Sequence, residues 1–375
     1  MTTLLILLPI GAALVIWLLP LNPISAGSLA VLAALVEVGV WIQLLVRFDF
    51  HRSGLQFEQH RSWFSDLHVS YHVGVYGFSV WLIGLTVVVM AAAIAYAFWA
   101  GRERVRAYMG LMLLLDGAVV GVFAAQDLLL FYAFFEAMLI PLYVLVGVWG
   151  GPGRLGATLK FVIYTMAGSL LMLASIVVYG LGKGTFDLVA IGSSGSDWIF
   201  LGFAAAFAIK APLFPLHGWL PDAYRESSPE VAAVLSGVVS KAAAYGFLRI
   251  AIAKFPGPTH DYRLPILVLA GAGLVYSRRR LAVPRLAFAQ RALEHKLYFD
   301  EAYDLVFYRP AVATGRLFGR IVEGLVVGGS ITELGRGIGD AARGVARAQT
   351  GLLRTYALAI AGSLAVLVVV FISVK

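Results

Sequence analysis

Several apolar stretches of this chain contain an ionisable side chain. A protein that moves protons or ions across a membrane needs such groups within its membrane spans. Glu136 is the strongest case, because it lies in the run LLLFYAFFEAMLIPLYVLVGV, residues 128–148. That run has about 21 residues, which is roughly 30 Å of helix and enough to cross a bilayer. A charge there costs about 2.5–3.5 kcal/mol, whereas Leu or Met would fill the space without that cost. We therefore predict a proton or ion site at Glu136; the alternative is an acid that only hydrogen-bonds two helices together.

Two lysines also fall within apolar stretches. Lys210 lies in WIFLGFAAAFAIKAPLFPLHGWLPDA, where Pro212 and Pro215 follow it closely. A proline inside a helix costs about 3 kcal/mol, so we predict a broken helix that ends near Lys210. The negative end of its dipole would stabilise the ammonium group, although a lysine that reaches a lipid headgroup is the alternative. Lys241 lies in the middle of another span, among the small residues of VVSKAAAYG, and we predict that it is buried.

Three further residues are weaker candidates. His217 follows Lys210 by seven residues, and a hydrogen-bonded histidine without a transport role is its alternative. Asp116 lies in the middle of the span before Glu136, and Asp222 follows the broken helix. A buried lysine releases its proton more easily, while a neighbouring carboxylate opposes the release. Glu136, Lys210 and Lys241 on three helices therefore predict a proton relay that is coupled by charge, with His217 on the path and Asp116 and Asp222 as auxiliary groups.

The composition is that of a membrane protein. The chain is 60% hydrophobic and 13% charged, against about 45–50% and about 25% in soluble proteins. Its net charge of +8 fits cytoplasmic loops and lipid headgroups, and no basic patch with interleaved aromatic residues indicates nucleic acid. The chain contains no cysteine, which excludes thiolate metal sites, iron–sulfur clusters and disulfides. Four histidines lie within residues 51–72, but their irregular spacing favours a solvated loop, and we predict no metal site.

The elements that must position these residues are membrane helices. We predict an all-α polytopic fold of about ten transmembrane helices, one of them broken, with both termini outside. The first, residues 2–19, has no basic region or cleavage site and is predicted to be a retained helix. The next seven are predicted at residues 29–46, 76–99, 108–124, 128–148, 160–181, from 198 onward, and 230–252. A marginal span at 264–277, a long amphipathic lateral helix at 287–348 and an anchor span complete the prediction.

Four long motifs make the chain recognisable. In order, they are LLLFYAFFEAMLIPLYVLVGVWGG, KFVIYTMAGSLLML, IKAPLFPLHGWLPDA and VSKAAAYGFLRI. They resemble chain M of respiratory complex I, the NADH–quinone oxidoreductase, which belongs to a family of antiporter-like subunits shared with Mrp-type sodium/proton antiporters. The resemblance covers residues about 1–255. It implies that Glu136, Lys210 and Lys241 are proton-path residues, and that Glu136 and Lys210 are a coupling pair.

The chain departs from that family beyond residue 255. A full subunit has a second inverted repeat with its own broken helix, and none is predicted here. Residues about 264–375, which include HKLYFDEAYDLVFYRP, instead resemble the tail of chain L, whose lateral helix ends in an anchor span. We therefore predict three parts: residues 1–107 with the first three spans, 108–255 as the antiporter-like repeat, and 256–375 as the chain-L-like tail.

The resemblance implies a proton-translocating, non-redox membrane subunit of NADH–quinone oxidoreductase. Other complex I subunits and the lipid bilayer would be its partners, and the bacterial inner membrane its location. NADH, FMN, iron–sulfur clusters and quinone would belong to partner subunits, so no cofactor is expected in this chain. Two alternatives remain open: a sodium/proton antiporter subunit, and a truncated or fused structural subunit that does not pump.

Overall fold

The computed structural model describes residues 1–64, 68–213 and 216–268, together with 309 and 313. The chain divides into two compact units, Met1–Glu301 and Ala302–Lys375, and all the elements described below lie in the first. Six helical segments there are long and apolar enough to cross a membrane, and a shorter apolar helix, Thr2–Leu18, precedes them. The chain is therefore an integral membrane protein, as its composition predicts.

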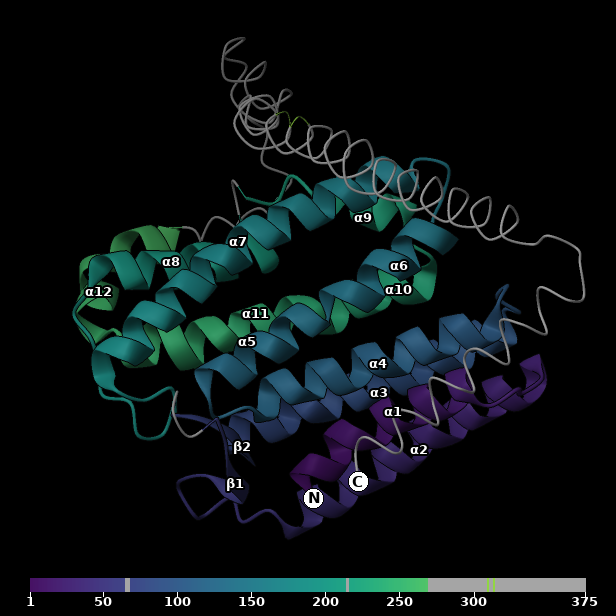
Figure 1. Cartoon of the computed structure of the whole chain (residues 1–375), viewed down its shortest axis with the longest axis horizontal. Helices are drawn as coiled ribbons and strands as arrows, with labels where there is room; N and C mark the ends of the chain where they lie inside the picture. Colours follow the sequence, from purple (N-terminus) through teal and green to yellow (C-terminus); the bar gives the residue numbers. More distant parts are fainter. Residues whose placement is uncertain (65–67, 214–215, 269–308, 310–312, 314–375) are drawn as a thin grey trace, which may run out of the picture. The chain divides into compact units, whose positions relative to one another are not determined.

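The first four helices run back and forth between the two ends of this unit (Figure 1). They are α1 (Thr2–Leu18), α2 (Pro23–Arg47), α3 (Gly77–Trp99) and α4 (Val105–Ala124). Asn22 caps α2 by accepting a hydrogen bond from the Ser25 amide at 2.7 Å, and a proline occupies the first turn, where no amide donor is needed. These bounds agree closely with the predicted spans, except that α2 begins at Pro23 and not at residue 29.

The spans that carry Glu136, Lys210 and Lys241 are interrupted. The Glu136 span consists of α5 (Leu128–Ala137) and α6 (Leu139–Trp149), and α7 (Arg154–Lys183) follows it. The next span, α8 (Asp197–Lys210), ends at Lys210, and a short helix, α9 (Leu220–Glu226), lies beyond the break. The last long span contains α10 (Pro229–Val234), the π-helix η2 (Leu235–Val239), α11 (Ser240–Gly246) and the π-helix η3 (Phe247–Ile252). The short helix α12 (Pro256–Asp261) follows it.

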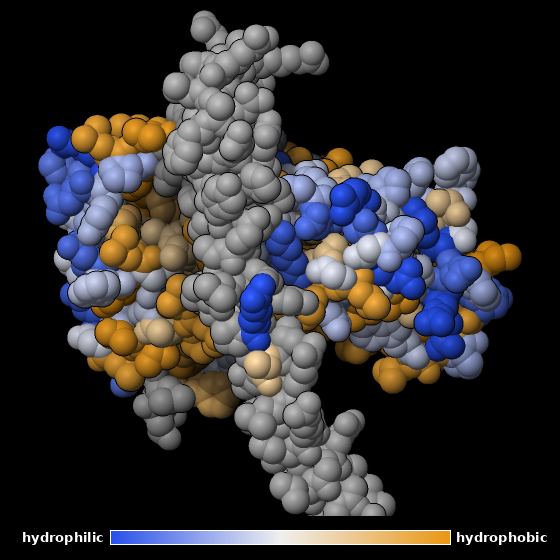
Figure 2. Space-filling model, turned by 90° about the horizontal axis from the view of Figure 1, so that it is seen from above, coloured by the Kyte–Doolittle hydropathy of each residue, from blue (hydrophilic) through white to orange (hydrophobic). Residues whose placement is uncertain are grey.

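Helix α4 is the centre of this unit. In its most apolar stretch 89% of the residues are buried, compared with 28% in α2 at the periphery. It packs against α1, α2, α3, α5 and α6, and Figure 1 shows it between the α1–α3 layer and the helices α5 and α11. The helices around it leave apolar side chains on the outer surface, where Figure 2 shows broad hydrophobic areas. Such surface suits contact with lipid or with other membrane subunits.

The stretch with the four histidines, predicted to be a solvated loop, is instead an antiparallel hairpin of β1 (Gln56–Phe64) and β2 (Val69–Val75), so the fold is not entirely α-helical. Strand β1 is mostly exposed, as a solvated segment would be, but β2 is not. Strand β2 is mostly buried because it packs under the α4–α5 turn, where the Gln126 amide donates to the His72 carbonyl at 2.8 Å. At this end the hairpin also contacts the start of α1, since the Thr2 hydroxyl donates to the Phe57 carbonyl at 2.9 Å.

The last predicted elements fall largely outside the described residues. These are most of the marginal span at 264–277, the lateral helix at 287–348 and the anchor span. The count of ten spans and the division into three parts therefore stay predictions.

Candidate functional site

Lys210 is buried at the end of α8. Only 2% of the residue is exposed, and its Nζ donates a hydrogen bond to the Phe135 carbonyl at 2.5 Å. The same ammonium group lies 3.7 Å from the centroid of the Phe135 ring, a cation–π contact. The structure thus confirms that the helix ends at Lys210 and that the lysine does not extend to the surface.

The break after Lys210 is stabilised by groups within the protein. The Ala211 amide donates to the Phe207 carbonyl at 2.7 Å, and the Trp219 indole Nε1 donates to the Ile209 carbonyl at 2.9 Å. Because Pro212 cannot continue the helix, the last carbonyls of α8 would otherwise lack donors. The Trp219 indole supplies one of the missing donors. The carbonyl end of the helix also attracts the Lys210 ammonium group.

Glu136 lies just before the one-residue interruption between α5 and α6. Pro141 has no amide hydrogen to donate to the Ala137 carbonyl, and its ring crowds that carbonyl, so the helix is interrupted at Met138. The Glu136 side chain is half-buried, and its carboxylate attracts the Lys210 ammonium group through space. The ends of two interrupted helices therefore bring together a carboxylate, an ammonium group and a backbone carbonyl.

Lys241 corrects the sequence-based prediction, because its side chain is exposed and not buried. Its Nζ donates to the Ser236 carbonyl at 2.7 Å, five residues back across the π-helix η2. One face of helix α11 is buried and includes two alanines and Tyr245. Lys241 lies on the face that the described residues leave exposed. The structure does not place Lys241 with Lys210.

His217 and Asp222 follow the break in α8. His217 is half-buried, and its carbonyl accepts the Leu220 amide at 2.9 Å. Asp222 pairs with Lys160 of α7 at 3.3 Å and with Arg225 at 3.4 Å, so it belongs to an ion-pair group between α7 and α9. Roles for both in a proton path stay predictions.

Asp116 has a partner that the sequence analysis missed. It is fully buried in α4, and it interacts with Glu37, an equally buried acid of α2. No other group of the described chain hydrogen-bonds any oxygen of the two carboxyls. The signal in the sequence was the same as at Glu136, because Glu37 is the only acid in the apolar run of α2. Two carboxyls that lie side by side away from water would repel each other if both were charged.

A second missed acid, Glu230, anchors the start of α10. Its carboxylate accepts two hydrogen bonds from Arg102, at 2.7 and 2.8 Å, and a third from the Tyr108 hydroxyl at 2.5 Å. The hydrogen bond to Glu230 raises the pKa of Arg102 despite partial burial, so the arginine stays charged. This bidentate pair ties the loop before α4 to the last long span.

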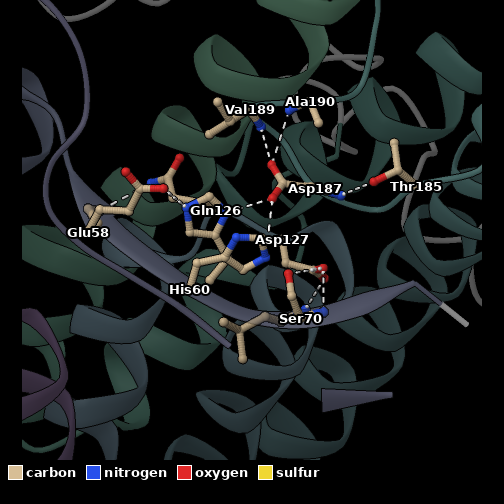
Figure 3. A network of polar contacts seen from close by, with 12 residues as sticks. Glu58, His60, Ser70, Gln126, Asp127, Thr185, Asp187, Val189 and Ala190 are labelled. Carbon is tan, nitrogen blue, oxygen red and sulfur yellow. Dashed lines mark hydrogen bonds and ion pairs between the residues drawn. The ribbon is translucent and has the colours of Figure 1, made fainter. Parts of the chain in front are cut away.

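The opposite end of the unit carries a polar cluster between the hairpin and the loops that join the helices (Figure 3). Asp127 caps α5 by accepting from the Leu129 amide at 2.9 Å, and it also accepts from the Ser70 amide at 3.0 Å. His72 lies between Asp187, at 2.7 Å, and Glu58, at 2.9 Å. Burial by itself would lower the pKa of His72, but these two carboxylates outweigh it and raise the pKa. The spacing of the histidines in the sequence gave no sign of this arrangement.

Comparison with known proteins identifies relatives of this chain. Residues 125–279 match a family described as the NADH:quinone oxidoreductase/Mrp antiporter transmembrane family. The chain is 36% identical over 293 residues to NADH-quinone oxidoreductase subunit M of Rhodobacter capsulatus, covering 72% of this chain and 57% of that one. It is 33% identical over 343 residues to NAD(P)H-quinone oxidoreductase chain 4 of Gloeobacter violaceus, covering 89% and 60%.

A solved structure of a similar protein has the same fold as this chain. The chain superimposes with a TM-score of 0.66 on a chain of respiratory complex I from Thermus thermophilus with bound NADH, at 34% identity. The match covers 74% of this chain and 58% of that one. The chain thus spans little more than half the length of these relatives, and the resemblance of its last residues to chain L is not confirmed.

Proposed function

Residues 125–279 carry the transmembrane domain of the NADH:quinone oxidoreductase/Mrp antiporter family, and on that premise we propose that this chain is a proton-translocating membrane subunit of an NADH–quinone oxidoreductase. In this role it is a non-redox translocase. NADH, FMN, iron–sulfur clusters and quinone are held by partner subunits. Its surroundings are the other membrane subunits of the complex and the lipid of a bacterial inner membrane.

One observation carries the proposal. The buried Lys210 ammonium group lies at the break of α8 and donates to the Phe135 carbonyl, one residue before Glu136. Burying a cation costs several kcal/mol, and the structure offsets that cost with a helix C-terminus, a carbonyl and a nearby carboxylate. Discontinuous helices that meet at an ionisable group are the usual construction of ion sites in transporters.

The geometry implies coupling by charge. While Glu136 is ionised, it attracts the Lys210 ammonium group and helps to hold the proton on Nζ. When Glu136 takes up a proton, that attraction is lost, and the buried Nζ releases its own proton more readily. A proton arriving at Glu136 thus drives another one onward. This alternation of neutral and charged states requires no redox step at Glu136 or Lys210.

The onward path needs two further groups. We propose that His217, in the segment after the break, accepts the proton that Lys210 releases. We propose that Lys241 then exchanges protons with other groups. Because Lys241 is exposed on α11, it would exchange protons with a group beyond the described helices. The Glu37–Asp116 pair is proposed as an auxiliary proton store beside α4.

The test is Glu136→Gln, which keeps the shape of the side chain and removes its charge. In membrane vesicles that contain the assembled complex, quinone reduction by NADH should no longer acidify the lumen, while the chain remains in the membrane. Glu103→Gln is the matched control, because Glu103 is exposed in the loop before α4. Wild-type acidification in Glu136→Gln would refute the proposal. Sodium/proton exchange by the chain without NADH and quinone would favour an antiporter instead.

A further inference from the structure

The hairpin brings together two histidines that the sequence keeps apart. His60 of β1 and His72 of β2 are cross-strand partners, and their rings stack at 4.4 Å between centroids with an interplanar angle of 17°. The register of the hairpin alone produces this pair, since partners across an antiparallel ladder project from the same face.

A third group arrives from a distant loop. Asp187 lies between α7 and α8, and its Oδ2 is 2.7 Å from His72 Nδ1 and 3.9 Å from His60 Nε2. The three donor atoms all lie within 4.8 Å of one another. Two imidazole nitrogens and a carboxylate oxygen are ligands that zinc and similar transition metals prefer, whereas calcium and magnesium prefer oxygen alone.

The surrounding hydrogen bonds orient these atoms. Asp187 Oδ1 accepts from the amides of Val189, at 2.7 Å, and Ala190, at 3.1 Å, which leaves Oδ2 for the histidines. The other ring nitrogen of His72, Nε2, lies 2.9 Å from Glu58 Oε1. A metal-binding histidine almost always donates its second nitrogen to a carboxylate, carbonyl or water, which fixes the tautomer and the ring. Glu58 and the two amides are therefore placed as outer partners of a metal site.

The site is closed on one side and open on the other. His72 is 2% exposed and Asp187 is 9% exposed, so both are held by the protein, while the His60 side chain is 52% exposed. Three protein ligands with an open side leave a fourth position for water, and the exposed ring gives an ion a way in.

We propose that His60, His72 and Asp187 bind a divalent transition-metal ion of the zinc type, with water as the fourth ligand. The ion would join both strands of the hairpin to the loop between α7 and α8. This inference is independent of the proposed proton path, because none of its residues belongs to that path. It also replaces the prediction that these histidines form no metal site.

The test measures metal content in the full-length chain, purified in detergent and stripped with a chelator. After dialysis against a small excess of Zn²⁺ and removal of the free ion, we expect one bound ion per chain by elemental analysis. Loading with Co²⁺ should give the visible absorption of a tetrahedral site. His60→Ala should lose this binding, and because His60 is exposed, that variant should keep its fold. Glu58→Gln should weaken the affinity about 10–100-fold, as outer partners of metal sites do.

His51→Ala is the matched control, because His51 is an exposed histidine of the same loop. It should bind Zn²⁺ as the wild type does. Equal Zn²⁺ binding in the wild type, His60→Ala and Asp187→Asn would overturn the proposal. So would the absence of binding in the wild type, which would leave His72 as an ion-paired imidazolium between Glu58 and Asp187.

Discussion

Replacing Lys210 by Met should abolish proton transport and leave the fold nearly as stable as before. The substitution removes a buried charge, which relieves about 2.5–3.5 kcal/mol. It also leaves the Phe135 carbonyl without its donor, at a cost of about 1–3 kcal/mol. Loss of the cation–π contact adds about 0.5–2 kcal/mol. These terms nearly cancel, so the free energy of unfolding should stay within about 2 kcal/mol of the wild-type value.

Two measurements on the same variant separate function from folding. Acidification of vesicles during quinone reduction reports transport, and denaturant titration of the purified protein reports stability. Lys183→Met is the matched control, because Lys183 is exposed at the end of α7 and should change neither quantity. Normal transport in Lys210→Met would refute the relay. A loss of stability well beyond about 2 kcal/mol would show instead that the lysine is a structural group.

Further substitutions test the packing of the unit. Replacing Glu37 and Asp116 together by Leu should raise the free energy of unfolding by about 1–3 kcal/mol, because both buried carboxyls are removed and neither is left behind without a partner; a lower thermal midpoint would contradict this. Trp219→Phe should cost about 1–3 kcal/mol in a denaturant titration, because the Ile209 carbonyl loses its donor, and unchanged stability would argue against that bond. Asp127→Ala should cost about 0.5–2 kcal/mol and speed amide hydrogen exchange in the first turn of α5; equal exchange rates would exclude a capping role.

The membrane helices could be predicted from the sequence because each is a long apolar run with a clear boundary. The end of α8 at Lys210 was also predictable, since Pro212 cannot continue a helix. The interruption at Met138 was not predicted, although Pro141, which cannot donate to the Ala137 carbonyl, is present in the sequence. The π-helices η2 and η3 had no signal in the sequence, because they depend on how the last span packs.

By itself the sequence determined that Glu136 and Lys210 lie within membrane spans, because each is surrounded in the sequence by an apolar run that is long enough to cross a bilayer. Tertiary structure alone decided which groups meet. Lys241 lies mid-span as predicted, yet the rotation of α11 leaves it exposed. Glu37 meets Asp116, and His60 meets His72 and Asp187, across separations that no local pattern encodes. The physical reason is that periodicity fixes burial along one element, whereas contacts between elements depend on rotation and register that only packing sets.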